Sequence, residues 1–505
     1  FYDISMYLKR HIMEKELLSL TKKSGMVFVS KIIALVFSLL FNLLAARYLG
    51  AEIYGSFMYI YTFIIFWQVL IKFGLDEGLV SYIPRLQDKS EERNSLISFA
   101  LIISFMFSII VTSLVIINKS FIAAGILNNY QAAHLLGIMM PLLVFLVFIK
   151  MSRGVFRGIG NIKFFIIGKN ILFPFLKLLF IFILSSLGYK IYGLVITFYS
   201  ALLITSIYLI FIMRKLDLFG SLDTNFKDIY IKILSFSLPL SLSGVLSFLI
   251  NRIDIFMLGY FLSGTEVGIY NIALKVAILS SFILSSFNSI FAPTIASLYS
   301  EGAVDKIEFL YKAVTKWIVG FNLIFFALIL ILHEPILIIF GREFIVGSNV
   351  LILISIGQLI NASVGPAGYI NIMTGHPEYN LYTNLFTLAI NIILNYKLIP
   401  IYGIEGAAVA SLVSVATTNI IRLFFVYKEH RIHPYNRSYL KVIISIFITF
   451  VIVFYVKIIC AFVGLVQLVI FSILFIILFT LIFYLLGLSE EDKLVLEALL
   501  LKIGI

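Results

Sequence analysis

The sequence predicts an all-helical, multi-pass membrane protein with about fourteen transmembrane helices. Three observations support this prediction. Hydrophobic residues make up 61% of the 505 residues and charged residues only 13%, which leaves too few polar groups to coat a soluble globule of this size. Apolar stretches long enough to cross a bilayer recur along the chain. The second set of six stretches also repeats the first at a constant offset of 213 residues, which predicts two six-helix lobes followed by two extra helices.

The positions of the spans follow from length and polarity. A helix needs roughly 20 apolar residues, at 1.5 Å rise per residue, to cross a hydrocarbon core of about 30 Å. The predicted spans cover residues 25–47, 55–74, 96–117, 134–153, 164–186, 191–213, 232–258, 266–291, 313–333, 347–370, 379–398, 403–426, 438–458 and 464–486. The corresponding regions are an amphipathic cytoplasmic segment (1–24), an N-lobe (25–215), a cytoplasmic linker (216–231), a C-lobe (232–428), spans 13 and 14 (429–486) and an amphipathic cytoplasmic tail (487–505).

Two pairs of short loops carry the internal repeat. The run Tyr48-Leu49-Gly50, followed by Gly55, corresponds 213 residues later to Phe261-Leu262-Ser263, followed by Gly268. Residues 189–193 correspond in the same way to residues 402–406. Because each repeat holds an even number of spans, both enter the membrane in the same direction, and the pseudo-two-fold axis that relates them runs along the membrane normal. We therefore expect two lobes that face each other across a central cavity.

The distribution of positive charge predicts the orientation. Alternate loops, starting with the N-terminal segment, hold most of the 38 Lys and Arg residues. The opposite set of loops holds six, namely Arg47, Lys119, Lys190, Arg342, Lys397 and Lys457. By the positive-inside rule, both termini are cytoplasmic in the cell membrane. The net charge of +12 is explained by this topology and by attraction to anionic membrane lipids, so we expect no nucleic-acid partner.

Several other classes of protein are disfavoured. Residues 1–24 are charged and amphipathic and lack a small-residue cleavage site, so we expect no cleavable signal peptide. Cys460 is the single cysteine, which excludes an intramolecular disulfide framework and a cysteine metal cluster. The sequence has no Walker A motif, no zinc-ligand cluster and no long outer loop that could carry an active site. We therefore expect neither an enzyme nor a cofactor.

Several motifs resemble one transporter family. The run Phe236-Ser237-Leu238-Pro239-Leu240, the stretches 253–262 and 266–270, the first outer loop (46–55) and the connection at 156–161 are similar to segments of the polysaccharide exporters. These belong to the oligosaccharide flippase branch of the multidrug/oligosaccharidyl-lipid/polysaccharide exporter superfamily. The resemblance implies movement of a polyprenyl-linked oligosaccharide from the inner to the outer leaflet, by alternating access between two lobes. Membrane enzymes that assemble the glycan are then candidate partners.

Basic residues inside the spans are the first candidates for a substrate site, because a charge near the bilayer centre is costly and normally faces protein, water or cargo. Lys177 lies near the middle of the fifth span, three residues after Pro174, which frees a backbone carbonyl and can bend the helix. It either lines a cationic cavity or pairs with a neighbouring polar group. Lys31 lies roughly 9 Å above the inner end of the first span. It either joins the cavity or snorkels to the headgroups.

A second basic position is expected on spans 7 and 8. Arg252 and Lys275 lie at similar depth, roughly 9 to 12 Å below the outer end of their helices. Asp254 is the one carboxylate placed well within a span. It cannot pair well with Arg252, because residues two apart on a helix point to opposite sides. Asp254 either forms a structural ion pair with Lys275 or titrates and couples transport to protons or sodium.

A basic stripe is predicted at the inner end of the fourth span. Lys150, Arg153 and Arg157 fall within about 60° of one another on a helical wheel and form a stripe roughly 10 Å long. Arginine binds phosphate oxygens bidentately, so the stripe suits a diphosphate, although positive-inside anchors give the same pattern. The neighbouring Lys72 and Asp76 are predicted to form a simple helix-end ion pair.

Uncharged polar residues and prolines complete the candidate set. Asn288, Gln358, Asn361, Asn391 and Asn395 lie in the second lobe, where they bind either sugar hydroxyls or, as we expect more, neighbouring helices. Pro141, Pro239 and Pro366 are expected to break three spans and to provide gating bends.

These features favour a flippase with a cationic path. The path would run from the stripe and Lys31 to Lys177, and then to Arg252 and Lys275. A cation-coupled multidrug exporter of the same superfamily is the main alternative, although cationic cargo would require carboxylates in the cavity. A scaffold for glycan-assembling enzymes is a third hypothesis, disfavoured by the repeat and by the charges inside the spans.

Overall fold

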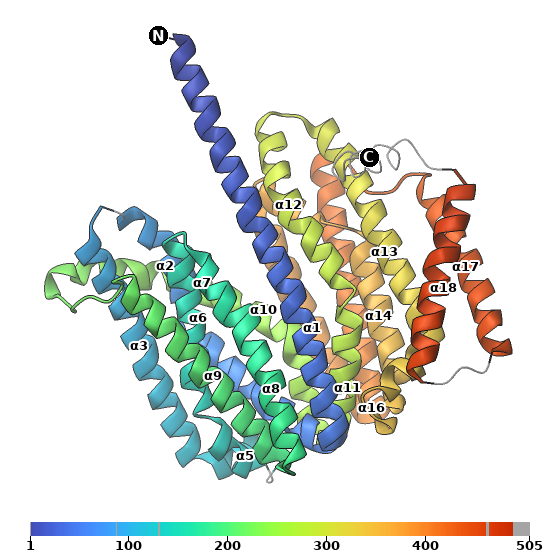
Figure 1. Cartoon of the computed structure of the whole chain (residues 1–505), viewed down its shortest axis with the longest axis horizontal. Coiled ribbons are helices and arrows are strands. Elements are labelled where there is room, and N and C mark those ends of the chain that lie inside the picture. The colour runs from blue at the N-terminus through green and yellow to red at the C-terminus, as the bar shows by residue number, and fades with distance from the viewer. Residues whose placement is uncertain (1, 87, 130–131, 461–463, 488–505) are drawn as a thin grey trace. The chain divides into compact units, whose positions relative to one another are not determined.

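The computed structural model describes residues 2–86, 88–129, 132–460 and 464–487, and the regular elements in these ranges are helices (Figure 1). The predicted C-terminal amphipathic helix lies outside these ranges, apart from residue 487. The α-helices are α1 (Tyr2–Ile71), α2 (Leu75–Tyr82), α3 (Ser90–Ile117), α4 (Lys119–Phe121), α5 (Ala132–Met139), α6 (Leu142–Gly158), α7 (Ile162–Ile166), α8 (Phe173–Ser186), α9 (Lys190–Lys215), α10 (Lys227–Phe261), α11 (Gly264–Ile278), α12 (Ser281–Ser300), α13 (Val304–Ile338), α14 (Ser348–Ser363), α15 (Ala367–Met373), α16 (Pro377–His430), α17 (Tyr439–Ile459) and α18 (Leu465–Leu485). Shorter elements are the 3-10 helices η1 (Ile83–Leu86), η4 (Thr224–Phe226) and η5 (Arg342–Gly347) and the π-helical turns η2 (Ile122–Ile126) and η3 (Ile167–Leu172).

The number of apolar helices is compatible with the predicted fourteen spans. Within the described ranges, 11 helices are long and apolar enough to cross a membrane, and the pair α5 and α6, bent by 49°, raises the number to 12. Two of these helices, α1 and α16, each contain a non-helical glycine, at Gly50 and Gly403. Dividing each at its glycine gives fourteen segments, a number compatible with the prediction. The eighth segment, Ser281–Ser300, overlaps only the second half of the predicted span 266–291, because α11 ends at Ile278.

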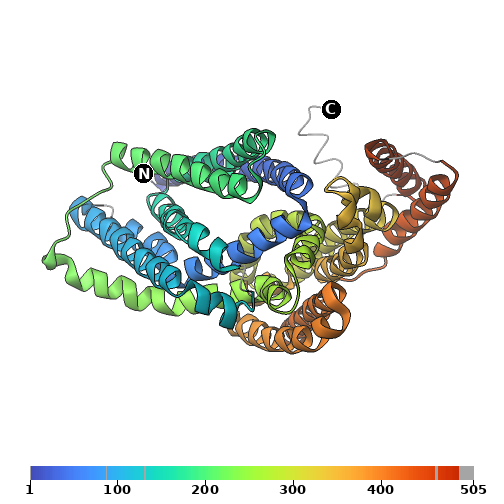
Figure 2. The same cartoon turned by 90° about the horizontal axis from the view of Figure 1, so that it is seen from below.

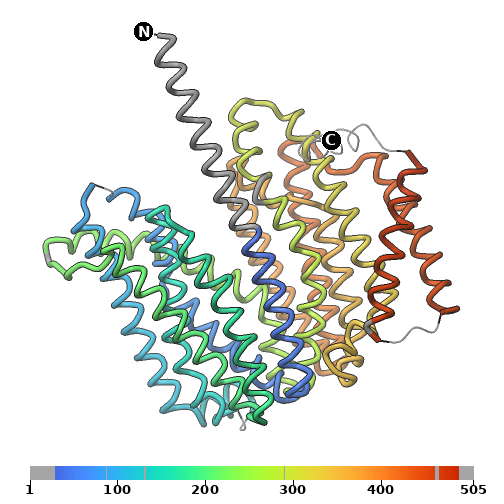
Figure 3. The backbone as a smooth tube through the Cα atoms, viewed as in Figure 1, coloured from blue at the N-terminus to red at the C-terminus, as the bar shows by residue number. Residues whose placement is uncertain are grey.

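Gly50 and Gly403 interrupt the helical backbone between neighbouring segments. Figure 3 shows the course of the backbone. Gly50 has φ 78° and ψ 167°, and Gly403 has φ 58° and ψ −135°. Such positive φ angles are accessible to glycine because it has no Cβ atom. Both glycines lie in loops that the internal repeat had singled out, so the repeat marks positions where the backbone must turn.

The three prolines behave differently from one another. The bend at Pro141 and the break between α14 and α15 at Pro366 are confirmed. The expected break at Pro239 is wrong, because α10 continues through this residue from Lys227 to Phe261. A proline removes one backbone hydrogen bond, and in membrane helices local adjustment often compensates for that loss.

The chain forms two compact units, and the first contains residues Phe1–Leu49 and Ser56–Phe248. In this unit α6 packs against α2, α3 and α9, and α8 packs against α9. Glycines allow α6 to approach α2 closely: a Cβ atom at Gly154 would lie 2.3 Å from the carbonyl oxygen of Asp76, and one at Gly158 would lie 2.8 Å from that of Leu79. This small-xxx-small spacing is typical of helix packing in membranes.

The second unit contains Gly50–Gly55 and Leu249–Ile505. In this unit α14 packs against α11, α13 and α16, while α17 and α18 lie side by side and pack on α13 (Figures 1 and 2). Gly55 and Gly268, which are equivalent in the internal repeat, mark a close contact. A Cβ atom at Gly55 would lie 2.4 Å from the backbone nitrogen of Gly268. The predicted lobe boundary at residues 216–231 stays a prediction.

Candidate functional site

Two lysines of the first unit lie against the same aromatic ring. The Nζ atom of Lys169, on η3, lies 4.1 Å from the centroid of Phe173, and that of Lys177, on α8, lies 5.1 Å from it. Lys177 also lies over Phe41, at 4.2 Å, and Phe198, at 5.1 Å. Aromatic faces attract ammonium groups, with contributions of about 0.5–2 kcal/mol each. These rings therefore hold two lysine amino groups inside a membrane-spanning part of the protein.

Pro174 explains how Lys169 comes to lie in this span. Proline has no N–H group and cannot donate to the carbonyl oxygen of Asn170, four residues earlier. The turn before it is π-helical, from Ile167 to Leu172, and carries Lys169. Such π-helical turns occur frequently at functional sites. Lys169 lies at the inner end of the predicted span 164–186, among the positive charges that indicate the orientation, and sequence reasoning therefore missed it.

Among the residues that the structure describes, no acidic group forms an ion pair with Lys169 or Lys177. Aromatic rings contact both lysines, and Lys169 also interacts electrostatically with Lys177 and Lys150. A buried ammonium group is costly unless it is paired and hydrogen-bonded. Aromatic faces offset part of this cost but supply no hydrogen-bond acceptor oxygens. The pair can therefore receive an anion that carries several oxygen atoms, as a diphosphate does.

Lys31 lies near this segment but is exposed. The preceding residue, Ser30, is buried and accepts a hydrogen bond of 3.1 Å from Nδ2 of Asn170. This contact fixes α1 against η3. The structure records no contact of Lys31 with Lys169 or Lys177 among the described residues, so its placement fits either the cavity entrance or the headgroup region.

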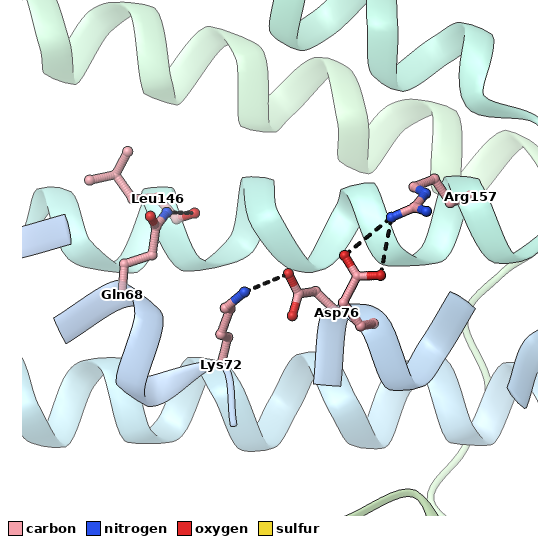
Figure 4. Close-up of polar contacts among 6 residues, drawn as sticks. Gln68, Lys72, Asp76, Leu146 and Arg157 are labelled. Atoms are coloured by element: carbon pink, nitrogen blue, oxygen red, sulfur yellow. Dashed lines mark hydrogen bonds and ion pairs between the residues drawn. The ribbon is translucent and has the colours of Figure 1, made fainter. Parts of the chain in front are cut away.

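Arg157, at the end of the predicted basic stripe on α6, lies beside a carboxylate of α2 (Figure 4). Arg157 donates to both carboxylate oxygens of Glu77 at 3.2 Å. Lys150 interacts electrostatically with Arg153 and also with Glu77. The stripe is therefore partly neutralised, and Arg153 is the arginine of the stripe without a described ion pair.

The predicted helix-end pair beside the stripe is confirmed. The Nζ atom of Lys72 lies 2.8 Å from Oδ2 of Asp76 (Figure 4). Asp76 is only 3% exposed, and its Oδ1 atom has no hydrogen-bond partner in the described structure. The pair lies at the contact between α2 and α6, where Gly154 approaches the backbone of Asp76.

In the second unit, Arg252 and Lys275 are both near Tyr54. Lys275 donates to the Tyr54 hydroxyl at 2.7 Å, and Arg252 interacts electrostatically with the same residue. The Tyr54 hydroxyl lies 3.3 Å from Oδ1 of Asn271, to which it donates. Tyr54 is 1% exposed and Asn271 is fully buried. Sequence reasoning missed Tyr54, because the motif Tyr54-Gly55 does not indicate that the tyrosine hydroxyl accepts a hydrogen bond from Lys275.

The hydrogen-bond partners of Asp254 differ from Lys275, the partner considered from the sequence. Asp254 accepts hydrogen bonds of 2.9 Å from the hydroxyl of Tyr270 and from Nδ2 of Asn395. The ion pair with Lys275 is therefore wrong for the described structure, because neutral donors on α11 and α16 occupy both carboxylate oxygens. Asp254 is 6% exposed, and the described partners of its carboxyl group are neutral hydrogen-bond donors.

The surroundings of Asp254 are rich in oxygen atoms. Asn395 also donates to Asn391, and Asn391 donates to the hydroxyl of Ser414 at 3.0 Å. The expectation that these asparagines bind helix to helix is confirmed for both. The Oδ1 atom of Asn395, which is fully buried, has no hydrogen-bond partner in the described structure. Carboxylate, amide and hydroxyl oxygens together are the ligands that hard cations prefer.

One further base was missed by sequence reasoning. Arg422, on α16, donates from Nη2 to Oδ1 of Asn384 at 3.0 Å, and its buried Nε atom has no partner among the described residues. Arg422 lies near the end of a predicted span, where a basic residue is expected as a membrane anchor, so it was not selected as a candidate site residue.

Family models match this architecture. The model described as "Polysaccharide biosynthesis protein" matches residues 20–299, and the model described as "MatE" matches residues 239–397. Among similar proteins, the "Probable low-salt glycan biosynthesis flippase Agl15" of Haloferax volcanii is 24% identical over 184 residues, which cover 36% of this chain and 39% of that protein. The membrane protein MJ1068 of Methanocaldococcus jannaschii is 23% identical over 445 residues, which cover 80% of this chain and 83% of that protein.

Solved structures share the fold. The lipid II flippase MurJ in its inward closed conformation superposes with a TM-score of 0.73 at 16% identity and covers 91% of this chain and 97% of its own. An inward-facing multidrug resistance transporter of the MATE family gives a TM-score of 0.65 at 16% identity. The superposition covers 78% of this chain and 94% of the transporter. The first family model covers more than half of the sequence, and the predicted resemblance is thus confirmed: the chain belongs to the polysaccharide biosynthesis protein family of the multidrug/oligosaccharidyl-lipid/polysaccharide exporter superfamily.

Proposed function

We propose that this protein is a flippase that moves a polyprenyl-(di)phosphate-linked oligosaccharide from the cytoplasmic to the outer leaflet of the cell membrane by alternating access. The cargo would serve the assembly of cell-surface polysaccharide or glycoprotein. The observation that carries the proposal is the pair Lys169 and Lys177 against Phe173, two basic side chains in one span without a described acidic partner. Family membership and the glycan flippase among the similar proteins support it.

In this proposal the phosphate groups of the cargo meet bases in succession. Arg153, Arg157 and Lys31 receive the headgroup on the cytoplasmic side. Arg157 must then exchange Glu77 for phosphate, which is inexpensive because the two side chains are 33% and 45% exposed. Lys169 and Lys177 hold the phosphates deeper in the membrane. Binding there replaces aromatic faces by charged oxygen acceptors, which make stronger contacts with ammonium groups.

Arg252 and Lys275 are proposed as the basic position in the second lobe. Lys275 donates to the hydroxyl of Tyr54, and this hydrogen bond positions its amino group. Arg252, which interacts electrostatically with Tyr54, lies near the same hydroxyl-bearing residue. Arg252 and Lys275 would then release the headgroup toward the outer leaflet.

Asp254 is proposed as the coupling site for protons or sodium. Its carboxylate lies beside Asn391 and Asn395, and the unpartnered Oδ1 atom of Asn395 offers a further ligand oxygen. Binding of a cation would neutralise Asp254 and strengthen the contact between α10, α11 and α16. A coupling ion can bias alternating access only if it binds one conformation better than the other.

A cation-coupled multidrug exporter remains the second candidate, and the match of the MatE model to residues 239–397 favours it. The charge of the site argues against it. Cationic drugs require acidic groups toward the cargo, whereas Lys169 and Lys177 would repel them. We also propose, from the distribution of positive charge, that both termini are cytoplasmic, and that neither catalysis nor nucleic-acid binding is part of the function.

The test is leaflet crossing in proteoliposomes that contain the intact protein. A labelled polyprenyl-diphosphate oligosaccharide is supplied in one leaflet, and its appearance in the other is followed under imposed proton and sodium gradients. We expect protein-dependent crossing of this cargo and no extrusion of a cationic dye from the same vesicles. If the vesicles extruded the dye and the glycolipid did not cross, the flippase proposal would be overturned and the protein would be a drug exporter.

A further inference from the structure

A groove in the first unit lies between α3, α6 and α9, apart from the basic residues discussed above. Its volume is about 610 Å³, within the usual range for small-molecule sites. Phe105, Phe145, Phe148 and Ile210 contribute to its apolar wall. Phe105 is 50% exposed, so the groove opens to the surface of the unit. A long apolar chain fits such a wall. If the chain belongs to a molecule with a charged headgroup, the headgroup must lie at the polar end of the groove.

One end of the groove carries two opposite charges. Arg214, in the last turn of α9, and Asp217, just after the helix, both line it. Both side chains are exposed, and neither forms an ion pair with another residue in the described ranges. The groove thus offers one positive and one negative group, three residues apart, at the end of an apolar wall.

Asp217 lies two residues after the end of α9 in a left-handed conformation, with a φ of 48°. Aspartate tolerates this conformation, as glycine and asparagine do. An acidic group at the C-terminal end of a helix is, however, disfavoured by the helix dipole. The dipole therefore acts against an aspartate here, which indicates a role other than helix termination.

The polar end of the groove is held in place by α3. Asn94 donates from Nδ2 to the carbonyl oxygen of Asp217 at 2.7 Å, and Ser95 donates to that of Ser221 at 2.7 Å. The backbone nitrogen of Gly220 donates to Ser98 at 3.0 Å. The segment after α9 is therefore fixed against the first turns of α3. The two charges and the apolar wall form one preorganised surface.

We propose that this groove binds a membrane phospholipid whose headgroup carries a primary amine. The phosphate contacts Arg214, the ammonium group contacts Asp217, and one apolar chain lies against Phe105, Phe148 and Ile210. An anionic phospholipid without an amine satisfies Arg214 alone and leaves Asp217 facing its phosphate. The opposite charges therefore select a zwitterionic headgroup, and the site is independent of the glycolipid cargo.

A second groove of the same unit provides an internal control. It has a volume of about 460 Å³, is lined by Leu40, Phe175, Leu179 and neighbouring apolar residues, and has no charged lining residue. Lipid contacts there should lack headgroup selectivity. Lys215 supplies a second control, because it is exposed and basic like Arg214 but does not line the groove.

The experiment is native mass spectrometry of the full chain, titrated with phosphatidylethanolamine or phosphatidylglycerol of identical chains. We expect one phosphatidylethanolamine to bind at least about tenfold more tightly than phosphatidylglycerol, as one charge-assisted hydrogen bond implies. Arg214→Gln should weaken both lipids. Asp217→Asn should remove only the preference for the amine, because asparagine tolerates the left-handed backbone. Lys215→Gln should leave both affinities unchanged.

Filling the grooves separates this site from general lipid contact. Ile210→Trp should abolish the bound lipid, whereas Leu179→Trp in the control groove should not. Equal binding of the two lipids by the unmodified protein, or an unchanged preference in Asp217→Asn, would overturn the proposal. The proposal would also be overturned if Lys215→Gln or Leu179→Trp lost the bound lipid to the same extent as Arg214→Gln or Ile210→Trp.

Discussion

Replacement of Lys177 by methionine separates a cargo-binding lysine from a structural one. Methionine keeps most of the volume of the side chain and removes the charge. Lys177 has three aromatic neighbours, at 4.2, 5.1 and 5.1 Å, and no described acidic partner. If it donates to cargo phosphate, its loss removes about 1.5–3 kcal/mol of binding, the usual contribution of a charged hydrogen bond. Crossing of the glycolipid should then slow by roughly 10- to 100-fold.

Lys177→Met should not lose thermal stability, although it loses transport. The variant loses cation–π contacts of about 0.5–2 kcal/mol each. It also no longer desolvates an unpaired ammonium group, which in other proteins costs several kcal/mol. Methionine packs well against aromatic rings. We therefore expect the unfolding temperature of Lys177→Met to be unchanged or higher than that of the unmodified protein.

The assay is leaflet crossing of a labelled polyprenyl-diphosphate oligosaccharide in proteoliposomes, with thermal unfolding measured on the same preparations. Lys163→Met is the matched control, because Lys163 is an exposed lysine earlier in the same span segment. Lys163→Met should move the labelled cargo across the membrane at the same rate as the unmodified protein. Normal crossing by Lys177→Met, combined with a lower unfolding temperature, would refute the reasoning and make Lys177 a structural residue.

Three further outcomes follow from the contacts. Asp254→Asn should keep a folded protein but make crossing insensitive to proton and sodium gradients; a gradient response equal to that of the unmodified protein would exclude Asp254 as the coupling site. Gly154→Ala should destabilise the protein by about 1–3 kcal/mol through overpacking, since its Cβ atom would lie 2.3 Å from a backbone oxygen; Gly125→Ala, with open space around it, should not. Glu77→Gln, which breaks the exposed pair with Arg157, should change the unfolding free energy by less than about 1 kcal/mol in a denaturant titration, and a larger loss would show that the pair is structural.

The fold was largely predictable because membrane spans depend on length and apolarity, both of which the sequence displays. The order of the spans and the turns at Gly50 and Gly403 followed from the repeat. The behaviour of Pro239 could not be predicted from its type alone. Whether a proline interrupts a membrane helix depends on how neighbouring groups satisfy the freed carbonyl, and this is a tertiary property.

The site was less predictable because its partners are mostly uncharged. Pairing by charge suggested Lys275 for Asp254, but the structure places the hydroxyl of Tyr270 and the amide of Asn395 there. Lys169 was overlooked because it was counted with the positive charges at the inner end of the predicted span 164–186, although Pro174, five residues later, is a signal that could have suggested an irregular turn. Charge patterns locate basic residues, whereas hydrogen bonds between distant helices become visible only in three dimensions.

The most direct test of the central claim compares two cargoes that carry the same oligosaccharide, one on a polyprenyl diphosphate and one on a phosphate-free lipid of equal length. If Lys169 and Lys177 recognise phosphate, proteoliposomes with the unmodified protein should move the first and leave the second in its original leaflet. Equal crossing of the two lipids would contradict a cationic site as the basis of recognition.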